Sequence, residues 1–352
     1  MDSLLVESPG GLFCPAGDFY VDAWRGVERN IVSHAHSDHA RRGSAHYLAA
    51  ADGVAILKER IGSDSNVTGV PYGEAVNLNG VHVSLHPAGH VRGSAQVRIE
   101  NRGRVLVFSG DYKRQPDPTC DSFEPVRCHE FITESTFGLP IYRWPDPTAV
   151  AADINAWWRR NVELRRTSVI LAYTLGKAQR VLSMLDRDIG PILLHGSMLR
   201  MTQVYRETGC DLPPAEHASP ERAKAEKGRA LVIAPPSAHG STWMRKFLPI
   251  SVGSASGWMA VRGHRRRRSV DRGFVLSDHA DWPDLLRTIT DTAAERVGVT
   301  HGYTGVITRF LRDRGADAYA INTRFVGDAD DPPESETLAS AGAVEADGGT
   351  QE

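Results

Sequence analysis

The chain has 352 residues, 41% of them hydrophobic, and a formal net charge of −2 at pH 7. This length and composition allow a large buried core, which favours one large folded domain or two moderate ones. The chain has no run of 18 apolar residues and no N-terminal basic segment followed by an apolar one, so we expect neither membrane insertion nor export.

Charge and cysteine content indicate which kind of partner the protein can bind and in which compartment it is expected. Residues 328–352 contain eight acidic groups and no Lys or Arg, so the rest of the chain is net basic, which permits a polyanionic partner without requiring one. This segment lacks aromatic residues and is rich in small residues and Pro, so we predict a disordered acidic tail over residues 327–352. The four cysteines form no C-x-x-C pair, which favours a reducing, cytoplasmic location.

Six apolar, β-rich runs along the chain end in polar residues. Each is predicted to be a strand that delivers polar side chains to one edge of a rigid sheet, where chemistry is commonly placed. The runs are RNIVSHAH (29–36), VHVSLHPAGH (81–90), RVLVFSGD (104–111), EFITES (130–135), FVLSDH (274–279) and RVGVTH (296–301).

Between the fourth and fifth runs, helical and strand patterns alternate. Residues 147–161 and 176–185 show apolar residues at helical spacing, and Trp157 and Trp158 are assigned to the core of this region rather than to base stacking. The runs SVILAYT, PILLHG and ALVIAPP are predicted strands. The alternation predicts an α/β unit over residues 148–269, inserted between a first core segment (1–147) and a second one (270–326).

The motif H-x-H-x-D-H at residues 34–39 is a dense group of metal ligands. His34 and His36 have period-2 spacing, and Asp38 and His39 follow in the turn. Imidazole and carboxylate suit zinc and similar divalent ions. Four ligands in so short a segment cannot all bind one small tetrahedral ion, so we expect further ligands and a second ion. His90 and Asp111, each at a strand end, are the candidates.

This order of motifs resembles the metallo-β-lactamase fold, an αββα sandwich. The resemblance implies two zinc ions, with manganese as an alternative metal. It implies that His34, His36 and His90 hold one ion, that Asp38 and His39 hold the other, and that Asp111 bridges them. Asp22 matches an early aspartate of that family, which orients a ligand without binding metal itself.

The later motifs resemble the β-CASP branch of that fold, which processes nucleic acids. Glu134, His279 and His301 follow the core motifs in the order typical of the branch, and AYTLGKAQRVL resembles a signature of its inserted cap domain. The resemblance implies that His301 completes the second zinc site, that His279 lies near the scissile phosphate, and that Glu134 orients His279.

The substrate class follows from a longer resemblance. Residues 10–325 are similar to the bacterial ligase-associated DNA exonuclease family, notably in GLFCPAGDFYVDAW and SGDYKRQPDPTCDSFEPVRCHEFITESTFGLPIYRWPDP. The resemblance implies a DNA exonuclease in DNA repair whose partners are an ATP-dependent DNA ligase and a DEXH-type helicase. His301 instead favours RNA, because DNA-processing members usually carry valine there, so an RNA-processing nuclease is the alternative.

The motifs also predict how a phosphodiester would be cleaved and which basic residues would contact the substrate. Two zinc ions would activate water and polarise phosphoryl oxygens. Protonated His279 is expected to act as the acid, held cationic by Glu134, while Asp38 also accepts a hydrogen bond from the attacking water. Candidate phosphate contacts are the basic residues that follow the metal motifs or lie in the inserted unit. They are Arg41, Arg42, Lys113, Arg114, Arg262, Arg265, Arg266, Arg267 and Arg268.

Two other classes fit parts of the pattern. The fold also supports ester and lactam hydrolysis, but Glu134, His279 and the large inserted unit argue against a small substrate. A noncatalytic scaffold would be expected to have lost ligands, and every ligand of the motif set is present.

Overall fold

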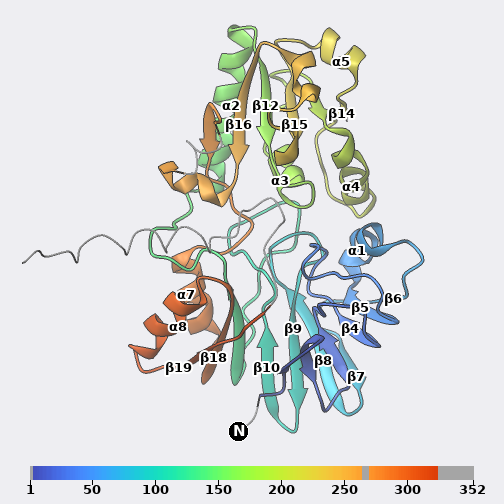
Figure 1. Cartoon of the computed structure of the whole chain (residues 1–352), viewed down its shortest axis with the longest axis vertical. Helices are drawn as coiled ribbons and strands as arrows, with labels where there is room; N and C mark the ends of the chain where they lie inside the picture. The colour runs from blue at the N-terminus through green and yellow to red at the C-terminus, as the bar shows by residue number, and fades with distance from the viewer. Residues whose placement is uncertain (1–2, 264–268, 324–352) are drawn as a thin grey trace, which may run out of the picture.

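The computed structural model describes residues 3–263 and 269–323. In Figure 1 the lower half of the molecule contains two sheets and the upper half contains a third. Sheet A is ordered β1 (Val6–Ser8), β2 (Gly11–Cys14), β3 (Phe19–Val21), β4 (Arg29–Ile31), β5 (His46–Ala50), β6 (Val67–Val70). Sheet B is ordered β19 (Asp317–Ala320), β18 (Arg296–Gly302), β11 (Glu130–Ser135), β10 (Arg104–Phe108), β9 (Ala95–Asn101), β8 (Val81–Pro87), β7 (Ala75–Leu78). Sheet C is ordered β14 (Glu216–His217), β13 (Ile192–Leu194), β15 (Leu231–Ala234), β12 (Thr167–Leu171), β16 (Ile250–Ala255), β17 (Arg272–Phe274).

Sheets A and B pack face to face, and helices cover their outer faces (Figure 1). The shared core joins Phe19 and Ile31 of sheet A to Val83 and Val97 of sheet B. The α-helices of the described residues are α1 (Val54–Ile61), α2 (Pro147–Glu163), α3 (Lys177–Ser183), α4 (Gly196–Glu207), α5 (Pro220–Ala225), α7 (Trp282–Thr292) and α8 (Thr304–Arg312), and the 3-10 turns are η1 (Ala51–Gly53), η2 (Pro236–Ala238), η3 (Thr242–Phe247) and η4 (Gly257–Ala260). Helix α1 packs by sheet A, and α7 and α8 pack on sheet B. The order helix, sheet, sheet, helix is consistent with the expected α/β metallo-β-lactamase sandwich.

Sheet C is formed entirely by a segment that lies between β11 and β18 in the sequence. All its pairings are parallel, which agrees with the alternation of helices and strands in this segment. Helix α2 begins where Asp146 accepts a hydrogen bond from the backbone N–H of Thr148 and Pro147 occupies the first turn. The predicted helices and strands of this segment are therefore confirmed.

Two details of that prediction need correction. Strand β17 pairs with β16, so sheet C extends to Phe274, beyond the expected end of the unit at residue 269. The run FVLSDH was expected to be a strand, but only Phe274 lies in β17, and residues 275–279 form an irregular segment that leads to His279. A three-residue edge strand is too short to show a period-2 pattern, which explains the error.

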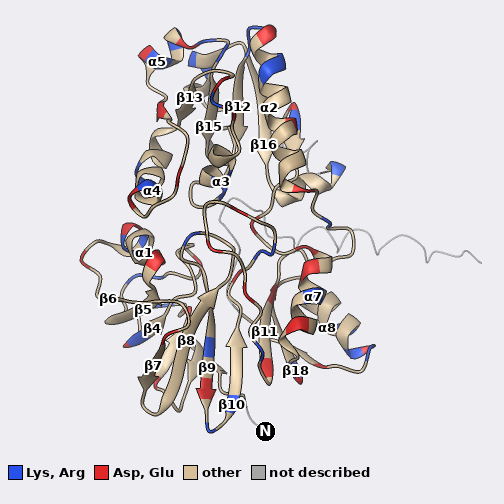
Figure 2. Ribbon diagram, turned by 180° about the vertical axis from the view of Figure 1, so that it is seen from behind, with Lys and Arg blue, Asp and Glu red and all other residues tan. Residues whose placement is uncertain are grey.

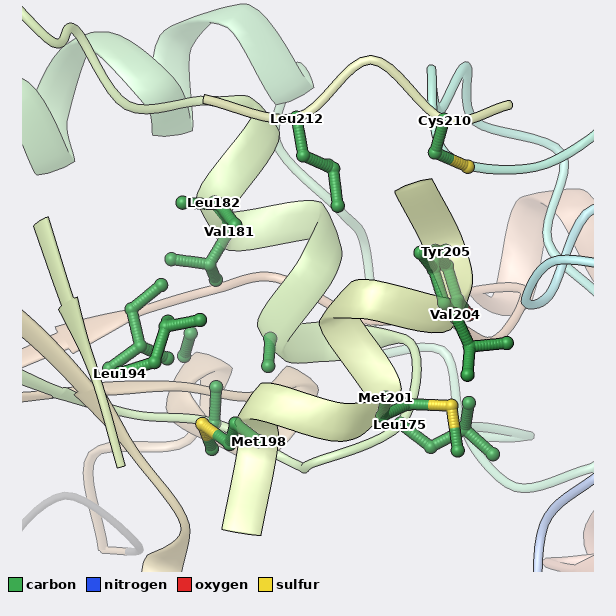
Figure 3. Close-up of a cluster of buried hydrophobic side chains, with 14 of the residues drawn as sticks. Leu175, Val181, Leu182, Leu194, Met198, Met201, Val204, Tyr205, Cys210 and Leu212 are labelled. Carbon is green, nitrogen blue, oxygen red and sulfur yellow. The ribbon is translucent and has the colours of Figure 1, made fainter. Parts of the chain in front are cut away.

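The upper and lower halves share one hydrophobic core. This core contains Val32 and Ala35, which follow β4, and Ile56 of α1, together with side chains of α3, α4 and sheet C. Figure 3 shows part of it, where Met198 and Met201 of α4 lie near side chains of α3 and its preceding loop. Because α1 also contacts α4 directly, the segment carrying sheet C is packed against the sandwich.

The tryptophan pair on α2 lies within this core region. Trp158 is fully buried, and its Nε1 donates a hydrogen bond to the Arg229 carbonyl at 3.0 Å. Trp157 is half-buried and meets Phe274 edge to face, with ring centroids 5.4 Å apart. The assignment of the pair to packing is therefore confirmed.

Charged residues are distributed over both halves, with acidic and basic segments interspersed (Figure 2). The predicted acidic tail, residues 327–352, lies outside the described residues. None of the helices that the structure describes is both long and apolar enough to span a bilayer.

Candidate metal centre and its cleft

Three buried histidine rings meet beyond the ends of β4 and β8. Nε2 of His34 lies 3.1 Å from Nδ1 of His36, and Nε2 of His90 lies 3.0 Å from the same atom. One nitrogen of each ring, together with an oxygen of Asp111, falls within a set whose members are all within 4.8 Å of one another. The structure thus brings together four residues that were expected to share an ion.

The outer nitrogens of two of these rings are held by backbone carbonyls. Nε2 of His36 donates to the carbonyl of Leu175 at 3.2 Å, and Nδ1 of His90 donates to the carbonyl of Asp278 at 2.6 Å. A carbonyl can only accept, so each outer nitrogen carries the proton and each inner nitrogen presents a lone pair.

The ring of His34 is oriented in the same way through a side chain. Its Nδ1 lies 3.0 Å from Oγ of Ser33, and that hydroxyl donates its own proton to Asp22 at 2.5 Å. The hydroxyl oxygen therefore accepts from His34, which leaves the inner Nε2 unprotonated. Burial and neighbouring histidines also hold the pKa of His34 and of His90 well below the ordinary value.

Three lone pairs facing one another at hydrogen-bond distance repel unless a cation lies among them. This donor set of neutral imidazoles with fixed outer protons is the arrangement that zinc sites use, and the residues present therefore fit a divalent ion. The identity and number of the ions are part of the proposal below.

A second group contains Asp38, His39 and His301. Oδ2 of Asp38 lies 3.7 Å from Nε2 of His39 and 3.8 Å from Nε2 of His301. Nδ1 of His39 donates to Oδ2 of Asp22 at 2.7 Å, so Nε2 of His39 faces the group. Burial lowers the pKa of His39, but Asp111, Asp38 and Asp22 raise it well above its ordinary value, which shows that this place favours positive charge.

Asp111 lies between the two groups. Its Oδ2 is 3.6 Å from Nε2 of His34 and 3.5 Å from Nε2 of His39, and its Oδ1 is 3.3 Å from Nδ1 of His301. Burial raises the pKa of Asp111, but His39 and His301 hold it well below the usual range, so the group is a carboxylate. This position agrees with the bridging role implied by the resemblance.

Unusual backbone conformations bring these groups together. Gly110 has a φ of 55°, and a Cβ there would lie 2.7 Å from the side chain of Ser33, so only glycine lets the strand end approach the motif. His301 has a φ of 62° at the end of β18, a left-handed conformation that costs about 1 kcal/mol or more for a non-glycine residue. Such strain is found where function requires a particular side-chain direction.

Glu134 and His279 form a third group with Asp111. The carboxylate of Glu134 accepts from Nδ1 of His279 at 2.9 Å and from the backbone N–H of Tyr112 at 2.8 Å. Burial lowers the pKa of His279, but Glu134 and Asp111 raise it to about 9, so the ring is a cation at neutral pH. The structure thus brings together Glu134 and His279, which were expected to act as a pair.

These groups open into one cleft between the two halves of the molecule. Metal-centre residues form one side, and residues of the sheet C segment and of the loop after β11 form the other. The lining residues are His36, Asp38, His90, Asp111, Thr136, Phe137, Tyr173, Leu175, Lys177, Ser256, Gly257, Trp258, Ser277, Asp278, His279 and His301.

The structure argues against two of the expected phosphate contacts. Lys113 is buried, pairs with Asp117 at 2.6 Å and does not line the cleft. Arg114 pairs with Asp291 on α7 at 2.7 Å, with 11% of its side chain exposed. Both follow Asp111 in sequence, but the chain turns inward after that residue.

The remaining basic candidates differ in position. Arg41, Arg42 and Arg262 are exposed, and Arg42 donates to the carbonyl of Arg60. The other four, Arg265, Arg266, Arg267 and Arg268, lie outside the described residues.

The structure adds residues that the sequence prediction missed. Asp278 and Lys177 line the cleft and pair with each other at 2.7 Å. Asp278 directly precedes the predicted catalytic residue His279, and Lys177 lies within the signature AYTLGKAQRVL. Both residues were therefore in or next to motifs that the sequence analysis had identified. No spacing rule pairs residues 101 positions apart, and only the fold brings them together.

The chain is similar to known proteins in sequence and in fold. No protein-family model matches the chain. A protein of Opitutus terrae named "Probable DNA ligase" is 31% identical over 334 residues, which cover 94% of this chain and 32% of that protein. Endoribonuclease YSH1 of Saccharomyces cerevisiae is 30% identical over 132 residues, which cover 37% of this chain and 17% of that protein. A crystal structure of a protein of unknown function from Enterococcus faecalis matches with a TM-score of 0.56 at 12% identity, covering 84% of this chain and 79% of that one.

The fold, the ligand arrangement and these relatives support a metallo-β-lactamase family of the β-CASP branch for this chain. The solved structure supports the fold alone. The chain spans about a third of the length of the first relative and less of the second.

Proposed function

We propose that this protein is a two-zinc phosphodiesterase that acts as a DNA exonuclease in DNA repair. The observation that carries the proposal is that two buried ligand groups, with Asp111 between them, lie on one cleft beside the Glu134–His279 pair. A metal centre next to a cationic imidazole suits the cleavage of an ester whose leaving oxygen needs a proton.

Two divalent ions held by His34, His36, His90 and Asp111 and by Asp38, His39, His301 and Asp111 would supply Lewis-acid activation of water and of the phosphoryl oxygens. Manganese is the alternative metal. Asp22 orients His34 through Ser33 and orients His39 directly, which sets both groups before substrate arrives. Asp38 is positioned to accept a hydrogen bond from the attacking water while serving as a ligand.

His279 is the proposed acid. Glu134 keeps the ring protonated and fixes its Nδ1, so Nε2 is left to donate a proton to the departing oxygen. Tyr112 in turn fixes Glu134 through its backbone N–H.

DNA is the favoured substrate because the relative that covers most of this chain is named as a DNA ligase. Within the proposal, residues 148–269, extended to Phe274, form a cap domain that covers the metal centre. The same relative, of which this chain spans only a part, supports a partnership with an ATP-dependent DNA ligase, and the family resemblance adds a DEXH-type helicase. The four free cysteines support a reducing cytoplasmic setting.

RNA processing is the second candidate. His301 and the 30% identity to an endoribonuclease over 132 residues favour it. The two candidates share the metal centre and His279, so they differ only in the contacts made by the sugar and bases.

The test is digestion of end-labelled DNA and RNA oligonucleotides of the same sequence by the zinc-loaded and the manganese-loaded protein. We expect DNA to be shortened from an end, and Asp38→Asn and His279→Ala to abolish this while circular dichroism stays unchanged. Faster digestion of RNA would replace the first candidate by the second. Undiminished cleavage by both variants would refute the mechanism.

A further inference from the structure

A network of five buried charged side chains lies directly behind the metal centre. Lys113 pairs with Asp117 at 2.6 Å, Lys177 pairs with Asp278 at 2.7 Å, and Arg180 contacts both carboxylates, at 3.4 and 3.1 Å. Lys113 also approaches Asp278 at 3.7 Å. The network joins α3 of the sheet C segment to the loops of the metal centre, since the carbonyl of Asp278 also holds His90.

The charges of this network do not balance. Each carboxylate lies within 2.7 Å of a lysine ammonium group and within 3.4 Å of Arg180, so each is paired with two cations. Among the described residues, the three cations form ion pairs only with these two carboxylates. One positive charge is therefore left over in a buried setting, where an uncompensated charge is unfavourable.

Of the three cations in the network, Lys177 is the one that lines the cleft. Lys177 and Asp278 line the cleft together with His279, whereas Lys113, Asp117 and Arg180 lie behind it. The side chain of Lys177 is 7% exposed, so it is held nearly rigid at the cleft wall. The hydroxyl residues Ser256 and Ser277 line the same cleft.

We propose that Lys177 binds a backbone phosphate of the substrate beside His279, and that this anion completes the charge balance of the buried network. The inference rests on the proposed function as a nuclease and names a substrate-binding residue for it. A phosphate oxygen is the chemical match, because it accepts hydrogen bonds from an ammonium group and brings the missing negative charge.

A different role for Lys177 makes the opposite prediction about stability. If the lysine only neutralised Asp278, its removal would leave a buried carboxylate short of partners and destabilise the fold. If the network instead carries an excess cation, its removal leaves Lys113 and Arg180 facing Asp117 and Asp278, two charges of each sign. In that case the variant folds at least as stably as the wild type.

The experiment compares Lys177→Met with Lys177→Arg and with Lys224→Met, an exposed lysine on α5 that does not line the cleft. The zinc-loaded proteins are assayed for kcat and KM on single-stranded DNA, for the affinity of inorganic phosphate by calorimetry, and for urea unfolding. Loss of a hydrogen bond between charged groups should raise KM for Lys177→Met by about ten- to a hundredfold and weaken phosphate by a similar factor. We expect Lys177→Arg to restore most of the affinity and Lys224→Met to change neither.

The salt dependence gives an independent readout. The slope of log affinity against log salt for single-stranded DNA should fall by about 0.7 in Lys177→Met, the value for one phosphate contact. Unchanged KM and phosphate affinity in Lys177→Met, or a loss of unfolding stability in that variant, overturns the proposal. If the wild type cleaves neither DNA nor RNA, the proposed function fails, and the phosphate titration still decides the role of Lys177.

Discussion

The carboxylate of Glu134 lies 2.9 Å from Nδ1 of His279, although 145 positions separate the two residues in the sequence. Glu134 belongs to β11 of the sandwich, and His279 follows sheet C on the return of the chain to the sandwich. The pair therefore forms only when the chain closes back on its first half.

The first prediction concerns the alkaline limit of activity. His279 must be protonated to act as an acid, and Glu134 raises its pKa to about 9, so activity should fall as the pH rises through that value. Glu134→Gln removes the main raising cause, so its alkaline limit should move to lower pH and its kcat at neutral pH should fall by about 10–100-fold. The pH dependence of kcat checks this, with Glu163→Gln on the exposed face of α2 as control. An unmoved alkaline limit in Glu134→Gln would contradict the role of the pair.

The second prediction concerns Asp22, which accepts hydrogen bonds from Ser33 and His39 and does not belong to either ligand group. Asp22→Asn should lower zinc affinity by about 10–100-fold, the usual effect of losing a group that orients metal ligands. Competition with a chromogenic chelator measures this. Asp18→Asn is a matched control, because Asp18 is exposed and shares the left-handed backbone of Asp22, with φ of 53° against 47°. Equal zinc affinity in the two variants would show that Asp22 does not orient the metal ligands.

The third prediction is that zinc stabilises the fold. Ligand present at a hundred times its dissociation constant adds about 2.7 kcal/mol to the free energy of unfolding. Chelator-treated protein should therefore melt at a higher temperature when zinc is restored, and His36→Gln should weaken that response. If the melting temperature of the wild type does not change when zinc is added, these residues do not form a metal centre.

The fourth prediction tests the packing of α2 on sheet C. Trp158 is fully buried, so Trp158→Ala should lower the free energy of unfolding by about 3–5 kcal/mol. Trp157→Ala should cost less, because that ring is half-buried. Urea titration of the two variants measures the difference. If Trp157→Ala lowered the free energy of unfolding more than Trp158→Ala, burial would not explain how much each side chain stabilises the fold.

The sequence allowed the prediction of the strand ends and of the alternating helices and strands because both depend on local periodicity. Predicting that His34, His90 and His301 meet required the family resemblance, since spacing alone does not reveal which strands become neighbours. Contacts beyond the motifs could not be predicted. Lys113 follows a recognised ligand, yet its direction is set by Asp117 and by the turn after Asp111. The lysine at position 177 acquires its position only when α3 packs beside Asp278.

The order of the ligands along the chain also limits when the centre can exist during synthesis. His34 is translated before sheet C, whereas His301 follows only after the whole of sheet C has been translated. A ribosome-bound chain therefore lacks a ligand of the second group and the strand that positions it until β18 has been made. A partly made copy that stops before β18 therefore cannot assemble both ligand groups, so the complete centre can form only after sheet C has been made.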